Sequence, residues 1–321
     1  MKTSLLTASL ILWVSFLVAQ QKEVTYVEKD FTASTVQKLE ASTSGGSIKV
    51  EGGNNSKATV AVILSPNGNS RTKGGDLQTL FEKEYDLELE VKNGVLVAKA
   101  KRKNNRGNNP LSVSLRISVP KKIASDINTA GGSITLNNLE GNQNFQTAGG
   151  SLTLSQLAGN IKGQTAGGSI RLADSQGDIG VTTAGGSIRL DNIRGTISAN
   201  TSGGSITAKD VSGTLTASTS GGSISLDACE GNIQAGTSGG SINASVTKVT
   251  KSLQLSTSGG SVRIAVPKGA YDVDLHGSRV DLAGGDFNGT KTKKSIQGKL
   301  NGGGSSITAS SSSGSVALSW L

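Results

Sequence analysis

Apolar and polar residues in the middle of the chain recur with a fixed period. A hexad, Thr-Ala/Ser-Gly-Gly-Ser-Ile/Leu, opens each repeat. Counted from its Thr, the sixth and eighth positions are apolar in every repeat and the seventh is polar. This alternation is typical of a β-strand with one buried face, and the eleventh and fifteenth positions are also mostly apolar. The regular hexads begin at equal intervals, at Thr129, Thr147, Thr165, Thr183, Thr201, Thr219 and Thr237.

Two turn markers divide each repeat. One is the Gly-Gly pair of the hexad, and the other is a glycine at the thirteenth position, such as Gly177 or Gly195. Glycine suits turns because it adopts positive φ without steric cost. Each repeat therefore predicts two short strands and two turns, which make one coil of about 18 residues in a parallel β-solenoid. The predicted fold class is all-β: a stacked β-solenoid (β-helix) with β-rich caps, since one coil alone buries too little to fold.

The flanking segments keep this pattern in irregular form. An eighth hexad at residues 257–262 begins two positions later than the period requires, so the coil before it carries an insertion. An outlying copy at residues 43–48 precedes Thr129 by a distance that is not a whole number of periods. We therefore predict a signal peptide (1–19), a basic N-terminal cap with the first strands (20–128), the regular solenoid (129–256), and degenerate C-terminal coils with a cap (257–321).

Charge distinguishes the caps from the regular repeats. Residues 22–122 carry 17 Lys and Arg against 11 Asp and Glu, whereas residues 129–256 carry seven of each. Residues 76–85 predict a short helix, and residues 99–109 predict a basic loop or hairpin tip. Such a tip could contact lipopolysaccharide or surface glycans, while nucleic acid is not an expected partner because no aromatic residues interleave with the basic ones. The candidate polyanion contacts are Lys99, Lys101, Arg102, Lys103 and Arg106.

Composition narrows the chemistry. The chain has 44 glycines, 45 serines and 29 threonines, but only 3% aromatic residues, one histidine and one cysteine. Long helices, disulfide scaffolds and cysteine-based metal sites are therefore not expected. We predict no catalytic residues, no metal and no cofactor.

The N-terminal segment predicts export. Lys2 precedes a largely apolar run from Leu5 to Val18, which is too short to span a bilayer comfortably. A basic start, a short apolar run and a small residue before a polar segment are typical of a secretory signal peptide, with cleavage expected after Ala19. We predict a periplasmic, outer-surface or secreted protein with no transmembrane segment after signal removal.

The aspartates of the repeats are the main candidates for catalysis. Solenoids also host polysaccharide lyases and glycosidases, which need paired carboxylates, or a carboxylate with Arg or Lys, in a groove. Here the aspartates drift in repeat position, and Phe145 is the only aromatic residue from 129 to 256. We therefore expect a non-enzyme. The aspartates are Asp174, Asp178, Asp191, Asp210 and Asp227.

Other polar residues have simpler interpretations. The rows of hexad threonines could order water, as in ice-binding solenoids, but satisfying backbone groups within the Gly-Gly turn is the simpler role. Serine follows the glycine pair where calcium-binding repeats need carboxylates, although one weak ion site near Asp281 and Asp286 stays open. We expect His276 on a solvated strand face, and Cys229 in the core because its repeat position is otherwise mostly apolar.

The tandem hexads, the segment from Val266 to Ala270 and the export signal together resemble the bacterial putative-adhesin β-strand repeat family of undefined function. The resemblance covers roughly residues 36–320 and implies a secreted or envelope-attached β-solenoid. Many members of that family have Asp where this chain has Ser after the Gly pair. The resemblance transfers no catalytic residues.

We therefore predict an exported, non-enzymatic β-solenoid. It would act as a cell-surface or periplasmic adhesin or scaffold through polar contacts with glycans or other envelope components. The alternatives are a carbohydrate-active enzyme, a lyase or glycosidase, on the same solenoid, and a self-assembling structural protein.

Overall fold

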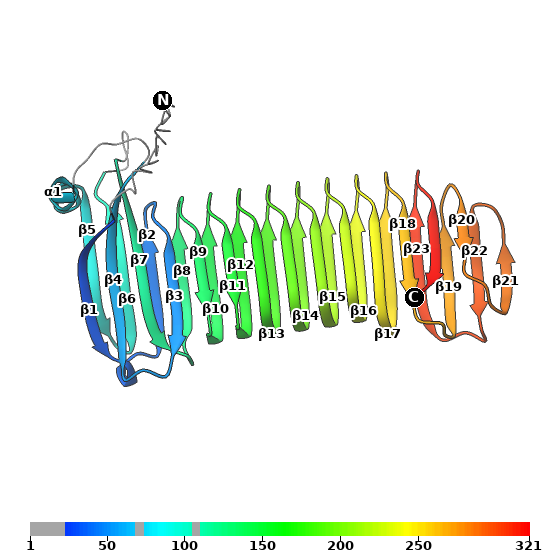
Figure 1. Ribbon diagram of the computed structural model, residues 1–321, viewed down its shortest axis with the longest axis horizontal. Helices are drawn as coiled ribbons and strands as arrows, with labels where there is room; N and C mark the ends of the chain where they lie inside the picture. The colour runs from blue at the N-terminus through cyan, green and yellow to red at the C-terminus, as the bar shows by residue number, and fades with distance from the viewer. Residues whose placement is uncertain (1–22, 68–73, 105–109) are drawn as a thin grey trace, which may run out of the picture.

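The computed structural model describes residues 23–67, 74–104 and 110–321, which form one continuous rod (Figure 1). The predicted signal peptide and Arg106 lie outside these residues. The described part contains 24 β-strands, one α-helix and the short 3-10 helix Ala33–Thr35. Most strand pairs are parallel and stacked along the rod, so the predicted all-β parallel solenoid is confirmed.

Successive regular coils pair with an offset of one repeat. Ile170 lies opposite Ile188, and Thr183 lies opposite Thr201. The same offset continues through the next two coils, and the insertion before the eighth hexad appears as shifts in register between β16 and β17. The strands are β8 (Ala124–Thr129), β9 (Ile134–Asn137), β10 (Glu140–Thr147), β11 (Leu152–Ser155), β12 (Ala158–Thr165), β13 (Ile170–Thr183), β14 (Ile188–Thr201), β15 (Ile206–Thr219), β16 (Ile224–Thr237) and β17 (Ile242–Thr257).

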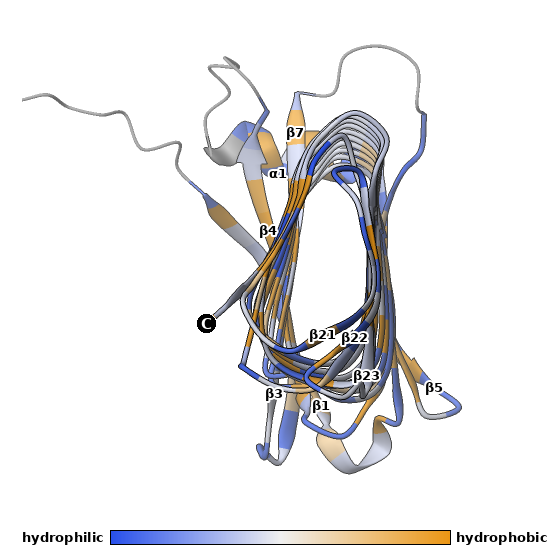
Figure 2. Cartoon of the chain, turned by 90° about the vertical axis from the view of Figure 1, so that its right-hand side faces the viewer, coloured by the Kyte–Doolittle hydropathy of each residue, from blue (hydrophilic) through white to orange (hydrophobic). Residues whose placement is uncertain are grey.

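Viewed along its axis, the rod is a flattened ring with two long walls (Figure 2). The first wall, which follows the Gly-Gly turn, buries repeat positions 6 and 8, such as Ile188 and Leu190. The second wall leads into the next hexad and buries position 15, such as Ile197. The core predicted from the alternation is therefore confirmed.

One core column was not predicted from the sequence. The second wall also buries position 17, where Phe145 and Val181 point inward. The residue between them in this column is Gly163, whose Cβ would lie 2.2 Å from the Cε2 atom of Phe145. The large ring fills the space left by the missing side chain, and in the later coils the column holds small buried residues, Ala199, Ala217 and Ala235.

The connection opposite the Gly-Gly turn differs from the prediction. We expected the thirteenth-position glycine to separate two strands, but in β13, β14, β15 and β16 one strand of 14 residues runs through it. The chain bends at two positions, with φ of 54° at Asn192 and 126° at Gly195. Asn and Asp tolerate the left-handed region better than most residues. The tenth-position residues with positive φ are Asn138, Gln156, Asp174, Asn192, Asp210 and Ala228.

The N-terminal end does not stack in sequence order. The outlying hexad forms the coil next to the first regular coil, because Lys38 lies opposite Ala124 and Ile48 lies opposite Ile134. On its other side this coil pairs with β6 and β7, which come later in the chain. The outlying hexad is irregularly spaced because its coil lies between the first regular coil and the coil formed by β6 and β7, and the chain leaves the stack to make these strands. The strands are β2 (Lys38–Thr43), β3 (Ile48–Gly53), β6 (Val95–Arg102) and β7 (Leu111–Pro120).

The C-terminal end uses the same device. The final strands, β23 and β24, form a coil inserted between the β17–β18 coil and the β19–β20 coil. A degenerate hexad at residues 311–316 makes its turn, with Ser311 in the place of Thr. The last strand of the chain is therefore interior to the sheet. The strands are β18 (Val262–Val266), β19 (Tyr271–His276), β20 (Val280–Leu282), β23 (Ser305–Ser311) and β24 (Val316–Trp320).

Antiparallel strands cover both ends of the stack. At the N-terminal end β4 pairs with β7, β1 with β4, and β5 with β6. At the other end β22 pairs with β19, and β21 with β22. The outer strands carry exposed charges, such as Glu88 in β5 and Lys291 in β21, and charged edges oppose pairing with other chains. These strands are β1 (Val24–Thr32), β4 (Lys57–Pro66), β5 (Tyr85–Lys92), β21 (Phe287–Lys291) and β22 (Ser295–Leu300).

The predicted short helix is confirmed as α1 (Gly74–Glu84), which packs beside β1, β4 and β5. Its buried Phe81 contacts the rings of Tyr26 and Tyr85, at centroid distances of 4.5 and 5.5 Å. In the described ranges, no helix combines the length and the apolar character needed to cross a membrane.

Candidate functional site

The hexad threonines form a buried column along the second wall. Thr183 Oγ1 donates a hydrogen bond to the carbonyl oxygen of Gly168 in the preceding coil, at 2.8 Å, and accepts one from the N–H of Gly186 in its own turn, at 3.3 Å. The same two bonds recur in the neighbouring coils. The turn-satisfying role is therefore confirmed, and each hydroxyl also links two coils. Because these hydroxyls are buried, they cannot form an ice-binding surface.

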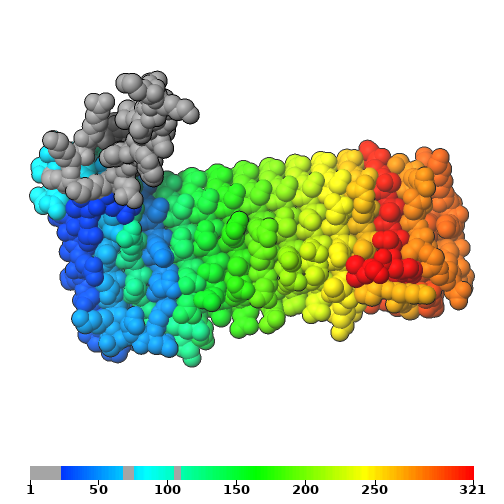
Figure 3. All heavy atoms as spheres, viewed as in Figure 1, coloured from blue at the N-terminus to red at the C-terminus, as the bar shows by residue number. Residues whose placement is uncertain are grey.

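The Gly-Gly turns stack at backbone distance. A Cβ on the second glycine, Gly186, would lie 2.1 Å from the carbonyl oxygen of Gly168, whereas a Cβ on the first glycine, Gly185, would have its nearest neighbour at 3.6 Å. In this turn, only the second position therefore requires glycine. Because the turns repeat so closely, residues flanking them form straight rows, and Figure 3 shows successive coils as parallel bands of side chains.

A shallow groove runs along the outer face of the second wall beside these turns, and we call it the turn-side groove. Its N-terminal part encloses about 530 Å³ between the β5–β6 hairpin and the first coils. A second hollow of about 340 Å³ continues it, and both are lined by Gln146 and Ala148. Two rows from the coils line the groove: the amide or hydroxyl row Asn128, Gln146, Gln164 and Thr182, and the methyl row Ala130, Ala148, Ala166 and Ala184.

The groove combines hydrogen-bonding groups with small apolar steps. Side-chain amides both donate and accept, and the alanine methyls form a second row beside them. At the N-terminal end the groove meets charged side chains, where Glu88 lies opposite Lys99 and Asp86 lies opposite Lys101. We did not predict this site from the sequence, because its two rows are neither core positions nor charged. The sequence does mark these rows: a polar residue comes immediately before each hexad threonine along the groove, and a small residue comes immediately after it.

The predicted polyanion contacts lie in a strand and are largely paired with acids. We expected a basic loop from residue 99, but Lys99, Lys101 and Arg102 belong to β6. Lys99 Nζ lies 2.9 Å from Glu40, and this hydrogen bond raises the pKa of Lys99 and lowers that of Glu40.

The neighbouring cations are held in the same way. Arg102 lies 3.3 Å from Glu84, and Lys103 lies 3.7 Å from Asp86 while donating to the Glu82 carbonyl. Three of the four described candidates thus have a carboxylate partner. Arg106, the fifth candidate, is outside the described residues.

Three of the five candidate carboxylates have structural partners or positions, whereas Asp178 and Asp227 are exposed on different parts of the coil. Asp174 and Asp210 occupy the left-handed tenth position, and Asp174 accepts a hydrogen bond from Asn192 at 2.7 Å. Asp191 forms a two-point ion pair with Arg189, at 2.7 and 3.0 Å. The aspartates occupy different repeat positions because they lie at different places on the coil.

The candidate ion site, His276 and Cys229 also have defined places in the structure. Asp281 forms an ion pair with Arg279 at 3.0 Å, and the N–H of Asp286 donates to Asn301. Within the described ranges, no three His, Cys, Asp or Glu side chains gather to hold a metal ion. His276 is exposed beside Asp274, as expected. Cys229 is fully buried, and burial raises the pKa of its thiol to about 11, which confirms a core role.

Comparison with known proteins supports the repeat fold over part of the chain. Residues 177–319 match the family model described as Toastrack DUF4097. No curated protein sequence matches the chain.

Three solved structures align over most of this chain at low identity. A putative cell adhesion protein from Clostridium sporogenes ATCC 15579 is 10% identical, with 94% of this chain and 100% of that chain covered and a TM-score of 0.22. A putative adhesin from Bacteroides fragilis NCTC 9343 is 13% identical, with 94% and 98% covered and a TM-score of 0.37. A putative lipid binding protein from Parabacteroides distasonis ATCC 8503 is 13% identical, with 91% and 96% covered and a TM-score of 0.42. By the family model, residues 177–319 of this chain are similar to the Toastrack family.

Proposed function

We propose that the protein is an exported, non-enzymatic adhesin or scaffold that makes polar contacts with neutral glycans along the turn-side groove. This proposal rests on the two rows that line the groove over four successive positions: the amide or hydroxyl row and the methyl row. Coils repeat at about 4.8 Å, so an extended polymer would meet the same chemistry repeatedly. Many weak contacts of this kind add up through effective concentration.

Glycans suit this groove better than charged ligands. Hydroxyl groups need partners that both donate and accept, which the amides of Asn128, Gln146 and Gln164 provide. The C–H faces of sugar rings can lie on the alanine methyls. Residues 129–256 have equal numbers of acidic and basic residues, so the regular coils favour a neutral polymer.

Two other functions predict different observations. A lyase or glycosidase would need two carboxylates free to act on one bond, and the partners of Asp174 and Asp191 argue against that use. A self-assembling protein would form filaments visible by electron microscopy, and the charged outer strands argue against it.

The decisive experiment for the groove is binding to an array of neutral polysaccharides. The variant Gln146→Ala/Gln164→Ala removes two amides that line the groove. Its control, Gln234→Ala/Gln254→Ala, removes two exposed amides from the same wall outside the groove. We expect about tenfold weaker binding for the first variant, equivalent to a hydrogen bond or two, and little change for the second. Equal losses, or no glycan bound by the parent protein, would reject the groove as the site.

Export has its own test. Cell fractionation with protease shaving should find the protein in the periplasm, on the surface or in the medium. A purely cytoplasmic pool would contradict the proposed location, whatever the result of the glycan array.

A further inference from the structure

We propose that the C-terminal end of the rod is a second binding surface, at which Lys291, Lys293 and Lys294 dock the rod end-on against an anionic phospholipid surface. These three residues, which we call the tip lysines, lie at the end of β21 and in the turn to β22. All three are exposed. The surface is separate from the turn-side groove and does not depend on glycan binding.

The tip lysines differ from the N-terminal cations in having no acidic partner. Among the described residues, none of the three forms an ion pair. Two acids of the same end have other partners: Asp281 pairs with Arg279, and Asp274 lies 2.8 Å from His276. The positive charge of the tip is therefore available to a partner, whereas binding at Lys99 or Lys103 would compete with an existing ion pair.

The backbone of the tip is held in place while its side chains are exposed. Thr292 Oγ1 accepts hydrogen bonds from the N–H groups of Lys294 and Ser295, at 3.3 and 3.0 Å. The carbonyl oxygens of Lys293 and Lys294 accept bonds from the N–H groups of Val280 and Gly277, at 2.9 and 3.0 Å. Binding would thus order only the side chains, which lowers its entropic cost.

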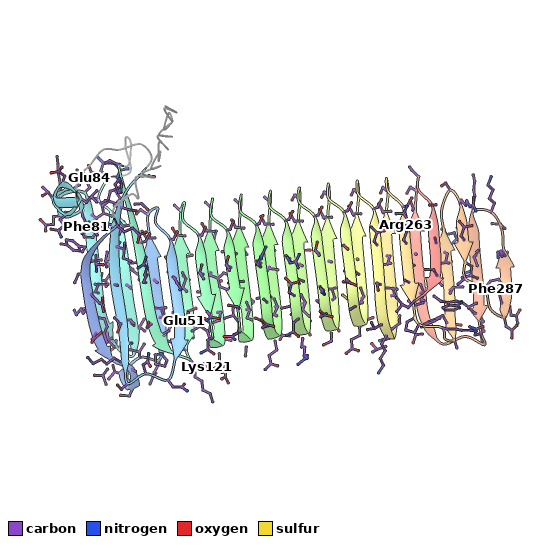
Figure 4. All side chains as sticks on the ribbon, viewed as in Figure 1. Glu51, Phe81, Glu84, Lys121, Arg263 and Phe287 are labelled. Carbon is purple, nitrogen blue, oxygen red and sulfur yellow. The ribbon has the colours of Figure 1, made fainter. Side chains whose placement is uncertain are left out.

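The position of the tip favours a surface over a small ligand. β21 is the last strand of the rod (Figure 1), and Figure 4 shows Phe287, at the start of this strand, at the extreme end of the molecule. Its side chain is half-buried. Lysine ammonium groups are compact point charges on flexible stems, suited to spread phosphates rather than to one bidentate contact. The tip lysines lie at one end of β21 and the partly exposed Phe287 at the other. Basic residues and a partly exposed aromatic side chain on one outer strand are features of a protein that binds at a lipid interface.

The test is co-sedimentation of the purified protein with vesicles of phosphatidylglycerol and phosphatidylcholine. We expect binding that falls with added salt and no binding to vesicles of phosphatidylcholine alone. Each lysine near an anionic surface contributes roughly a fivefold gain, so Lys291→Gln/Lys293→Gln/Lys294→Gln should bind about 100-fold more weakly. Phe287→Ser should weaken the part of the binding that salt does not remove.

The matched control is Lys99→Gln/Lys101→Gln/Lys103→Gln, which removes the same charge from the N-terminal cap. It should stay within about threefold of the parent protein, since its lysines are mostly paired. Equal losses in both triple variants would show an effect of net charge alone and overturn the proposal. So would failure of the parent protein to bind anionic vesicles. Binding to a sulfated glycan or to inorganic phosphate through the same lysines, without vesicle binding, would replace the lipid surface by another polyanion.

Discussion

The regular coils and the two ends of the rod are built from the same strands but are assembled differently. In the coils each strand pairs with the strand one repeat later. At the ends, one coil is inserted between two others that are distant in sequence, as when Leu253 pairs with Ile307 in β23. The coils depend on neighbours in the sequence, whereas the ends depend on long-range pairing. A regular coil should therefore be dispensable, and an inserted end coil should not.

Charge follows the same division. The regular coils balance their charges, and in the basic cluster of the N-terminal cap Lys99, Arg102 and Lys103 form ion pairs with Glu40, Glu84 and Asp86. Among the described residues, the lysines of the C-terminal tip have no such partner. Two ends that both carry clustered lysines thus present different surfaces to a partner.

The largest expected effect comes from deleting one coil of each kind. Removing residues 183–200 joins position 18 of one repeat to position 1 of the next. The rod should stay folded with one cooperative thermal transition and be shorter by about 4.8 Å. Removing residues 305–321, a segment of similar length, takes β23 and β24 from inside the stack and leaves sheet edges open, so we expect aggregation. Circular dichroism and light scattering measure both outcomes, and equal tolerance would mean that the inserted coil is not needed.

Backbone stacking within a coil gives the next largest effect. Gly186→Ala places a Cβ against the Gly168 carbonyl, and we expect a loss of about 3 kcal/mol in the free energy of unfolding. Gly185→Ala has room for its Cβ and should change stability by less than about 1 kcal/mol. Urea unfolding measures the free energy of unfolding of both variants. Similar losses for Gly185→Ala and Gly186→Ala would contradict the stacking argument.

Breaking the threonine column should cost somewhat less. Thr183→Val keeps the shape of the side chain but leaves the Gly186 N–H and the Gly168 carbonyl without the hydroxyl, so we expect a loss of about 2 kcal/mol. The exposed neighbour Thr182 is the control, because Thr182→Val should stay within about 0.5 kcal/mol. If both variants matched the parent protein in thermal unfolding, the column would not link the coils.

The smallest effect concerns the left-handed corner. Ala228 has a φ of 50°, which is unfavourable for alanine, so Ala228→Gly should stabilise the protein by about 0.5–1 kcal/mol. Asp210→Ala puts alanine at the equivalent corner of the preceding coil and should destabilise it by a similar amount. Changes of the same sign in urea unfolding would show that the corner conformation does not govern stability.

The repeat predicted the coil well because each of its contacts is local. Ile188, Leu190 and Ile197 are buried where the alternation placed them. Position 17 was missed because its residues range in size from Gly163 and alanines such as Ala199 to Phe145, so no one type of side chain runs through the whole column. The tenth-position bend was missed because Gln156 and Ala228 share a left-handed conformation that is usually associated with Asn and Asp.

The candidate sites were less predictable than the fold. A groove depends on which outward-facing residues line up across coils. Gln146 and Gln164 form one row only through the stacking of successive coils. The basic cluster at Lys99 was visible in the sequence, but its acidic partners were not. Glu40 is far away along the chain and is brought to Lys99 only by the pairing of β2 with β6.

The sequence by itself determined the coil: its period, its buried faces, its buried thiol and the turns that need glycine. These features follow from contacts between residues one repeat apart, and the spacing of the repeats shows which residues those are. Only the tertiary structure decided the order of the coils at the two ends, the groove along the second wall and which cations are free. Each of these depends on pairing between segments whose separation along the chain has no fixed period.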